Sequence, residues 1–316
     1  MRRDWPAEAV AYQESVRKAL RAIGGADAAR AAEAHPAQRD IVVAPALDQL
    51  GLRALDPWGD EEESAAAVLG VAAAGSCVLP WPLVHALAVP VPWRSDVGGV
   101  FLTAGTTARL DHADLLPGAL AVDIRTGTAR PITRDGRHPG PLDPFACDVT
   151  LGAAVPFDAT SSVHMHILLD AFWVGGALHT AVDLALAHAR ERRQFNTPIG
   201  QFGEIRWRIA DMVVARDGLD ELALHAWWLL HTGAARSADL LALRVQMIES
   251  AEAVLANGHQ ILGAMGLCEE HDLTVIDRHL QSVLHRPAGR IVSTDLFAAA
   301  VAREGFDGVY PVAAWE

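Results

Sequence analysis

Apolar residues recur at helical spacing along the first part of the chain. Between residues 6 and 23 they fall about one helical turn apart with charged residues between them, which predicts an amphipathic helix. The helical pattern continues to about residue 71, and a proline, a glycine and an acidic run at 55–63 predict a solvated loop within it. The prolines in 79–93 prevent one long helix there, because each removes a backbone donor and clashes one turn back. We therefore expect an N-terminal helical domain at 1–93.

The pattern changes in the middle of the chain. Short apolar runs at 100–103, 119–124 and 149–155 are separated by Gly, Pro and Asp residues. Such runs are typical of short strands joined by turns. They predict a small, mostly antiparallel β region of roughly 60 residues. We assign a shortened middle β domain to residues 94–157.

Helical periodicity returns after residue 158 and continues to the end of the chain. Ser161 or Ser162 is expected to cap a helix that runs to about Arg193, where an Asn-Thr-Pro sequence stops it. Further helices are predicted at 204–231, 237–263, 274–284 and 293–303. Because successive amphipathic helices with short links form bundles, residues 158–316 should be a C-terminal helical bundle domain. The expected fold class is mainly α with a small β region.

Composition narrows the class of protein. Apolar residues make up 51% of the 316 residues but form no run of eighteen or more, so we expect no transmembrane helix. The N-terminus has no apolar signal core, which favours a cytoplasmic location. Three cysteines without close spacing indicate reduced thiols and no zinc site. A net charge of −13 argues against a nucleic-acid binder, although a few arginines are enough to hold a nucleotide cofactor.

Two sequence blocks carry residues suited to a dinucleotide. The first reads A-R-E-R-R-Q-F at 189–195, followed by P-I-G-Q-F and, after a short gap, I-A-D-M; the second reads H-Q-I-L-G-A-M-G at 259–266. In the first block Arg192 offers a bidentate phosphate clamp beside the aromatic face of Phe195. In the second, Gln260 offers an amide to a base or ribose, and two glycines allow backbone amides to approach an anion. The plainer interpretation is two helix ends, with cations complementing the macrodipole and glycine as a C-cap.

Both blocks resemble signatures of the acyl-CoA dehydrogenase family, and the resemblance covers roughly residues 160–300. It implies that these blocks reach across a subunit interface to the adenosine diphosphate half of a neighbour's FAD. The residues that this implies for cofactor binding are Arg192, Gln194, Phe195, Gln260, Gly263 and Gly266. We expect them to lie together on one exposed, concave face.

The chain departs from the family in the parts that hold the isoalloxazine ring and the catalytic base. Its β region is roughly half the usual length and lacks the family's Thr-Glu-Pro-x-x-Gly-Ser-Asp and Trp-Ile-Thr-Asn strands. The count from the matched blocks places the family's glutamate base at Pro287, which has no proton acceptor, and the alternative base position of other members at His166. Two departures also fall within the matched region, at Gly203 and Ala264.

This pattern of loss is similar to the short, base-lacking subunit of heteromeric bacterial acyl-CoA dehydrogenases. The resemblance implies an oxidoreductase of lipid metabolism that desaturates an acyl-CoA thioester at its α,β bond. We expect the isolated chain to be inactive, and to share FAD with a complete acyl-CoA dehydrogenase subunit in a heterodimer or α2β2 heterotetramer. That partner would bind most of the acyl-CoA. The alternatives are a flavin-free scaffold or regulatory homologue, and a repurposed thioester tailoring enzyme that uses His166.

Two other residue types were weighed for chemistry. His164 and His166 stand two positions apart and so face different sides of a helix, which argues against a metal pair. We expect His166 to be a polar histidine at a helix start, with the general base as the weaker alternative. Four tryptophans at helical spacing are expected in the core or at an interface: Trp173, Trp207, Trp227 and Trp228.

Overall fold

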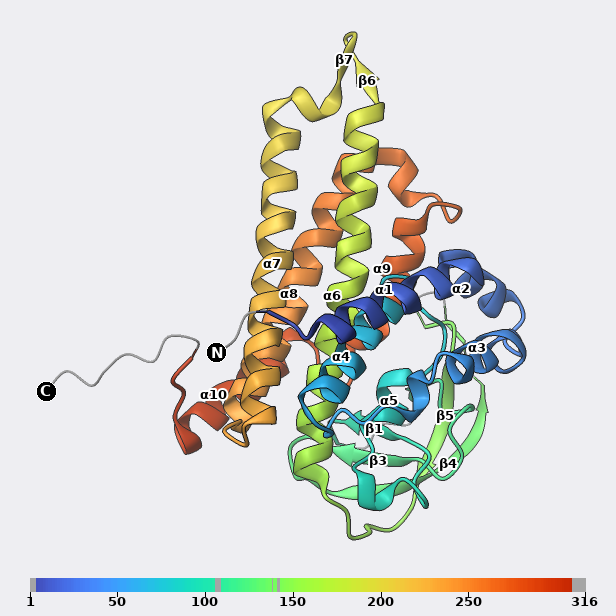
Figure 1. Cartoon of the computed structure of the whole chain (residues 1–316), viewed down its shortest axis with the longest axis vertical. Coiled ribbons are helices and arrows are strands. Elements are labelled where there is room, and N and C mark those ends of the chain that lie inside the picture. The colour runs from blue at the N-terminus through green and yellow to red at the C-terminus, as the bar shows by residue number, and fades with distance from the viewer. Residues whose placement is uncertain (1–3, 106–108, 138, 141–142, 309–316) are drawn as a thin grey trace, which may run out of the picture.

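A computed structural model of the chain describes residues 4–105, 109–137, 139–140 and 143–308 (Figure 1). The N-terminal part is helical, as predicted. Its elements are α1 (Ala7–Ala22), α2 (Ala26–Ala34), η1 (Arg39–Val43), α3 (Ala44–Gln49), η2 (Leu52–Ala54), α4 (Glu61–Gly75), α5 (Leu83–Leu87) and η3 (Val91–Trp93). The loop predicted at 55–63 is shorter than expected because the carboxylate of Asp60 caps α4, accepting from the amide of Glu63 at 2.9 Å. Acidic residues in the first turn suit the positive end of the helix dipole.

A five-stranded sheet follows, in the order β1-β3-β4-β5-β2. The strands are β1 (Val100–Thr103), β2 (Arg109–Asp111), β3 (Leu120–Asp123), β4 (Ala129–Arg137) and β5 (Ala146–Leu151). β1 pairs with β3 in parallel and the remaining pairs are antiparallel, so the predicted mostly antiparallel sheet is confirmed. The sequence pattern missed β2, which has one buried position, and β4, which carries mostly exposed side chains.

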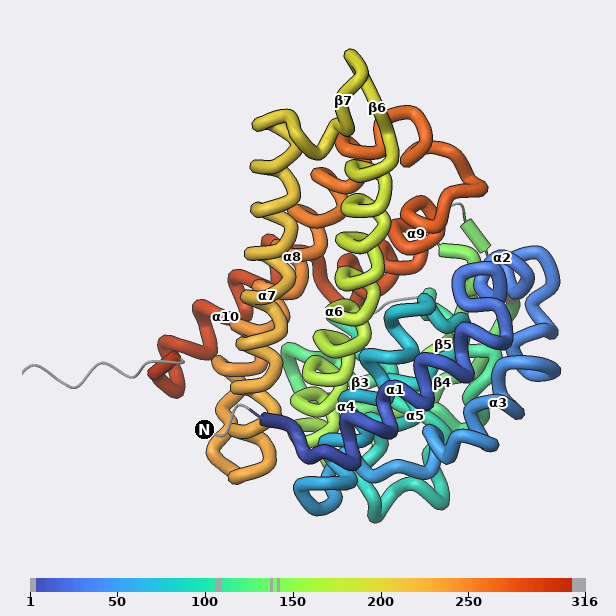
Figure 2. The backbone as a smooth tube through the Cα atoms, turned by 45° about the horizontal axis from the view of Figure 1, so that its top comes forward, coloured from blue at the N-terminus to red at the C-terminus, as the bar shows by residue number. Residues whose placement is uncertain are grey.

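The C-terminal part is a helical bundle around one long helix. Its elements are α6 (Ala159–Glu191), β6 (Arg193–Gln194), β7 (Thr197–Pro198), η4 (Ile199–Gln201), α7 (Gly203–His231), α8 (Ser237–Leu262), η5 (Gly263–Leu267), α9 (Asp272–His285) and α10 (Arg290–Glu304). α6 packs against α7 and α8 on one side and against α4, α5 and β1 on the other (Figure 1). In Figure 2 the hairpin β6–β7 projects from the bundle end that lies away from the sheet.

The start of α6 differs from the prediction. Asp158 is the cap, because its side chain accepts a hydrogen bond from the amide of Ser161 at 3.3 Å. Ser161 and Ser162 lie inside the first turn, and the Ser162 hydroxyl donates to the carbonyl of Ala88 at 2.7 Å. That buried bond ties the base of α6 to the segment that follows α5.

Two glycines allow α4 and α6 to cross at very short distance. A Cβ atom on Gly176 would lie 1.9 Å from the carbonyl oxygen of Ala72, and one on Gly75 would lie 1.9 Å from that of Trp173. Backbone therefore meets backbone at this crossing, and the crossing fixes α6 against the N-terminal helices.

α6 is long and apolar enough to span a membrane, by length and composition alone, and 78% of its most apolar window is buried inside the protein. That burial is what a central core helix requires. Of the four tryptophans, Trp173 and Trp227 are buried and Trp228 packs partly buried against the core, whereas Trp207 is 73% exposed on α7.

The architecture confirms a mainly α fold with a small β region. The N-terminal group of helices ends with η3 at Trp93, and the five-stranded sheet ends with β5 at Leu151. The domain boundaries at 93/94 and 157/158 stay a prediction.

Candidate functional site

The first matched block forms the hairpin that ends α6. The backbone N–H of Arg192 closes the helix on the carbonyl of His188 at 2.8 Å, and its carbonyl accepts from Ile199 at 2.8 Å across the hairpin. Phe195 and Asn196 adopt positive φ angles of 51° and 61°, which makes the turn between β6 and β7 tight. Non-glycine residues rarely adopt this region, and asparagine tolerates it best.

The side chains of this hairpin point into solvent. Phe195 is 91% exposed, and Arg192 and Gln194 are exposed as well. Within the part of the chain that the structure describes, the guanidinium of Arg192 has no hydrogen bond or ion pair, whereas that of Arg193 donates to the carbonyl of Asn196 at 3.2 Å. The hairpin therefore offers a free guanidinium and a free aromatic face.

The second matched block forms the end of α8 and the turn after it. Gln260 is exposed in the last turn, and Gly263 caps the helix with a φ of 58°, a conformation that glycine adopts without steric cost. Exposure was predicted for every cofactor residue and is wrong for Gly266. Its backbone is turned inward because its carbonyl accepts from the Nδ1 of His259 at 2.8 Å and from the Oγ1 of Thr274 at 2.9 Å.

The two blocks lie at the same end of the bundle (Figures 1 and 2). α6 and α8 both finish there, and α7 begins there. Electrostatics agree with this placement: burial lowers the pKa of His188 in the last turn of α6, and Arg192 and His271 lower it further. His271 immediately precedes α9, so the segment that follows η5 lies near the end of α6. The concave shape expected for this face stays a prediction.

A small cavity lies deeper in the molecule, between α6, the sheet and the segment after α9. Its volume is about 60 Å³, and His166 and Pro287 both line it. These are the two positions at which the family resemblance places a catalytic base, so the fold brings both to one point. The other lining residues used below are His85, Asp111, Asp170 and Arg286.

His166 is not the polar helix-start histidine that the sequence predicted. It is 3% exposed, because it lies in the second turn of α6 on the side that faces α5 and β1. Its Nδ1 lies 3.1 Å from the Oδ2 of Asp170, and its Nε2 lies 2.8 Å from the Nδ1 of His85. His164 faces another element, with its Nε2 3.2 Å from the hydroxyl of Ser237, as the i, i+2 spacing predicted.

The acceptors around His85 and His166 determine which of their ring nitrogens carry protons. Burial, together with the neighbouring His166, lowers the pKa of His85 to about 3, so the His85 ring is neutral. Because its Nδ1 also lies 3.1 Å from the carbonyl of Val100, which only accepts, that nitrogen carries the proton. The Nε2 of His166 must then accept, and its Nδ1 donates to Asp170. Both nitrogens of His166 are engaged inside the core.

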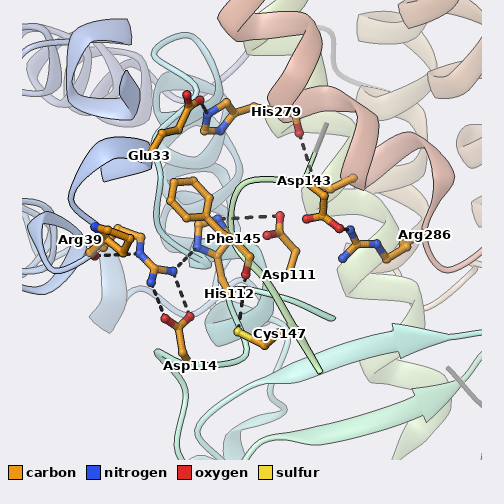
Figure 3. Close-up of polar contacts among 12 residues, drawn as sticks. Glu33, Arg39, Asp111, His112, Asp114, Asp143, Phe145, Cys147, His279 and Arg286 are labelled. Carbon is orange, nitrogen blue, oxygen red and sulfur yellow. Dashed lines mark hydrogen bonds and ion pairs between the residues drawn. The ribbon is translucent and has the colours of Figure 1, made fainter. Parts of the chain in front are cut away.

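A buried ionic and aromatic cluster adjoins Asp111, one of the residues that line the cavity (Figure 3). We call Arg39, His112, Asp114 and Phe145 the Arg39 cluster. Arg39 is 1% exposed, donates to both carboxylate oxygens of Asp114, and lies 3.0 Å from the Nδ1 of His112. Its guanidinium stands 4.7 Å from the centre of the Phe145 ring, and the His112 ring stacks on the same phenyl at 4.4 Å. Burial lowers the pKa of His112 to about 4, so that ring is neutral at pH 7.

Arg286 interacts electrostatically with Asp111 and directly precedes Pro287 in the chain. It forms an ion pair with Asp143, and together with Asp111 it lines the cavity (Figure 3). The Oδ1 of Asp111 and the Nη1 of Arg286 are buried without a hydrogen-bond partner. A cavity of this size holds a water molecule or two, and such orphaned groups are the usual partners of buried water.

Sequence reasoning missed these residues for a plain reason. They come from η1, the β2–β3 region, the segment before β5 and the segment after α9, and none forms a motif with its chain neighbours. Pro287 and His166 were found only because the matched blocks supplied a count. Over the described residues, no group of three or more His, Cys, Asp or Glu side chains is placed to hold a metal ion.

Comparison with known proteins gives a consistent picture. Residues 165–285 match the family model described as acyl-CoA dehydrogenase, C-terminal domain. The probable acyl-CoA dehydrogenase YngJ of Bacillus subtilis (strain 168) is 30% identical over 96 residues, which cover 30% of this chain and 25% of that relative. The match thus spans about a quarter of the relative's length.

Solved structures share the fold over nearly the whole chain. A variant of the Tcur3481-Tcur3483 steroid ACAD superposes with a TM-score of 0.79 at 16% identity, covering 94% of this chain and 98% of that one. The ChsE4-ChsE5 complex from Mycobacterium tuberculosis gives 0.79 at 15% identity, covering 96% and 99%. Glutaryl-CoA dehydrogenase from Mycobacterium smegmatis gives 0.71 at 15% identity, covering 96% of each chain.

Proposed function

We propose that this chain, whose residues 165–285 match the C-terminal domain of acyl-CoA dehydrogenases, is the non-base-bearing subunit of a heteromeric acyl-CoA dehydrogenase. The enzyme would be FAD-dependent and would desaturate an acyl-CoA thioester at the α,β bond. This chain would hold part of the FAD, and a complete partner chain would supply the base and most of the acyl-CoA site. Assembly would be a heterodimer or an α2β2 heterotetramer in the cytoplasm.

The observation that carries the proposal is the small size of the cavity at Pro287 and His166. Its volume of about 60 Å³ compares with roughly 300–1,000 Å³ for pockets that bind drug-sized ligands. One family base position holds Pro287, which has no proton acceptor, and the other holds a buried histidine whose nitrogens are both engaged. Neither a flavin ring nor an acyl thioester fits beside them.

The outer end of the bundle, in contrast, suits the adenosine diphosphate half of FAD. An exposed guanidinium suits a pyrophosphate, an exposed phenyl ring suits an adenine face, and an exposed amide suits a base or ribose. Arg192, Phe195 and Gln260 provide these groups at one end of the bundle. When bound, FAD supplies the hydride acceptor for the reaction, and this chain contributes anchoring only.

Structural neighbours support the pairing. The ChsE4-ChsE5 structure is described as a complex of two named components, and the Tcur3481-Tcur3483 protein also carries two component names. Both superpose on this chain over more than nine-tenths of its length. At this low sequence identity the superpositions show a shared fold alone. The partnership of this chain is our inference from that fold and from the small cavity.

The test compares two neighbouring arginines in the complex, purified through a tag on this chain. Losing a charge-assisted contact costs roughly 1.5–3 kcal/mol, so Arg192→Ala should weaken FAD retention about ten- to a hundredfold. Melting temperature should not change, because the Arg192 side chain has no bond within the described residues. Arg193→Ala is the matched control: it removes one exposed bond to the carbonyl of Asn196 and should leave FAD in place. Flavin fluorescence after dilution measures both.

Two outcomes would overturn the proposal. One is a chain that, purified alone, carries one FAD per chain and oxidises an acyl-CoA. The other is unchanged FAD retention in Arg192→Ala, which would favour the flavin-free scaffold. The tailoring-enzyme alternative is disfavoured because it needs a free nitrogen on His166, and both nitrogens are engaged beside a cavity too small for a thioester.

A further inference from the structure

His259 joins the turn after α8 to the helix that follows it. Its Nδ1 lies 2.8 Å from the carbonyl oxygen of Gly266, and its Nε2 lies 3.0 Å from the Oδ2 of Asp277 on α9. The missing side chain of Gly266 makes room for the ring, since a Cβ there would meet the His259 Nδ1 at 3.3 Å. One imidazole thus connects three elements: the last turn of α8, η5 and α9.

The partners of this ring define its protonation. A carbonyl oxygen and a carboxylate oxygen only accept hydrogen bonds, and a neutral imidazole has a single N–H. Both bonds of His259 therefore form together only when both nitrogens carry protons. Asp277 balances the resulting charge, and its other oxygen accepts from the Nε2 of Gln281 at 2.6 Å. Loss of one proton must break one of the two bonds.

The surroundings contain charges of both signs. The His259–Asp277 ion pair is partly buried, with side-chain exposures of 21% and 29%. His271, which precedes α9, interacts electrostatically with His259. A groove of about 280 Å³ between α8 and α9 is lined by His259 and Asp277, and the other titratable side chains along it are Glu252, His285 and Arg290. Asp277 is the only one of these within hydrogen-bond distance of the ring.

We propose that doubly protonated His259 is a positioning residue that holds the last turn of α8 and η5 in the shape that presents Gln260 and Gly263 to FAD. This inference rests on the proposed function and adds a residue that lies outside the set predicted from sequence. Gln260 is the next residue along the chain, and Gly263 lies between the two ends that the ring connects. The imidazolium fixes the turn from inside, and the exposed backbone above it faces the cofactor.

The wild-type chain alone supplies the first test. Nitrogen-15 NMR of the histidine rings should show protons on both His259 nitrogens in the folded chain, because both of their partners only accept hydrogen bonds. Hydrogen exchange at 263–267, corrected for its intrinsic pH dependence, should become about three- to tenfold faster as the imidazolium deprotonates, since one hydrogen bond is lost. A His259 ring with a single N–H in the folded chain, or exchange at 263–267 that stays the same when the ring loses a proton, would overturn the inference.

Two variants separate positioning from general stability. His259→Gln has one donor group and cannot reproduce both bonds, so 263–267 should exchange three- to tenfold faster at every pH. His259→Arg keeps a permanent charge and several donors, and its exchange should stay slow without the pH step. If His259→Gln exchanges like the wild type, the ring does not hold the turn.

In the FAD-loaded complex, His259→Gln should release flavin about three- to tenfold faster than wild type. Arg192→Ala is measured beside it. Unchanged release in Arg192→Ala would sink the proposed function while the exchange data still decide the role of His259. Faster release in Arg192→Ala with wild-type release in His259→Gln would sink the positioning role alone.

Discussion

Replacing Arg39 by Met should strongly destabilise the chain, and the reason is the charge that the replacement leaves behind. The side chains of Arg39 and Asp114 are 2% and 9% exposed, and the pair forms two hydrogen bonds. Arg39 also donates to the carbonyl of Pro36 at 3.0 Å and covers the face of Phe145. Methionine fills much of the same volume but carries no charge, so the buried Asp114 carboxylate would lose its guanidinium partner.

The size of the destabilisation follows from the loss of this buried ion pair. Removing one partner of a buried ion pair typically costs about 3–5 kcal/mol, whereas replacing both partners by apolar residues is often close to neutral. We expect Arg39→Met to lower the free energy of unfolding by about 3–5 kcal/mol, and Arg39→Met combined with Asp114→Leu to lose clearly less. Urea unfolding followed by circular dichroism measures both variants, and a double-mutant cycle gives the coupling.

Acid titration provides an independent arm. Burial alone would raise the pKa of Asp114, but the hydrogen bonds from Arg39 outweigh it and hold that pKa below its ordinary value. A depressed carboxylate pKa stabilises the fold above its unfolded value, and that stability is lost as pH falls through the folded pKa. Arg39→Met should lose this dependence. If Arg39→Met costs less than about 1 kcal/mol, or if the two substitutions are additive, Arg39 and Asp114 are not coupled as described.

Further outcomes follow from the packing and the buried charges. Gly176→Ala should destabilise by about 1–3 kcal/mol or more in a urea titration, because its Cβ would lie 1.9 Å from a carbonyl of α4. Gly218→Ala is the control, with nothing nearer than 3.9 Å, and should stabilise α7 by roughly 0.5–1 kcal/mol; equal effects would refute the crossing. Trp207→Ser, at a 73% exposed side chain, should reduce oligomer mass in light scattering without lowering the melting temperature. His85 and His112, with pKa values lowered to about 3 and about 4, stay neutral while unfolded histidines take up protons near 6.5, so stability should fall as pH drops from 6.5 toward 4. A urea midpoint that is constant over that range would contradict the burial of both rings.

Helices were predictable where their periodicity and caps are local. The pattern at 6–23 gave α1, and the Asn-Thr-Pro stop gave the hairpin after α6. The strand β4 was missed because its side chains are mostly exposed and it is defined by pairing with β3 and β5, which no local pattern reports. The cap of α6 was assigned to serines although Asp158, just before them, is the residue that accepts the bond.

The candidate site divides in the same way. Arg192, Phe195 and Gln260 were found because each stands within a short block whose spacing is visible in the chain. The environment of His166 could not be found, because its partners are one turn away in Asp170 and 81 residues away in His85. A buried network of this kind depends on how α5, α6 and β1 pack. The periodicity of each element leaves that packing undetermined.

The small cavity at Pro287 and the exposed hairpin at the end of the bundle both agree with a cofactor site shared between two chains. A buried ion pair contributes little net stability compared with apolar residues of the same volume, so stability alone does not explain the Arg39 cluster. The cluster lies next to Asp111, which lines the cavity together with Pro287. Burying the side chain of a phenylalanine contributes roughly 1.5–3 kcal/mol of favourable free energy. Because Phe195 is 91% exposed, nearly all of this free energy is available to a molecule that covers the ring. A chain whose cavity at Pro287 is this small, and whose hairpin is exposed, has the surface expected of a subunit that binds its cofactor between itself and another chain.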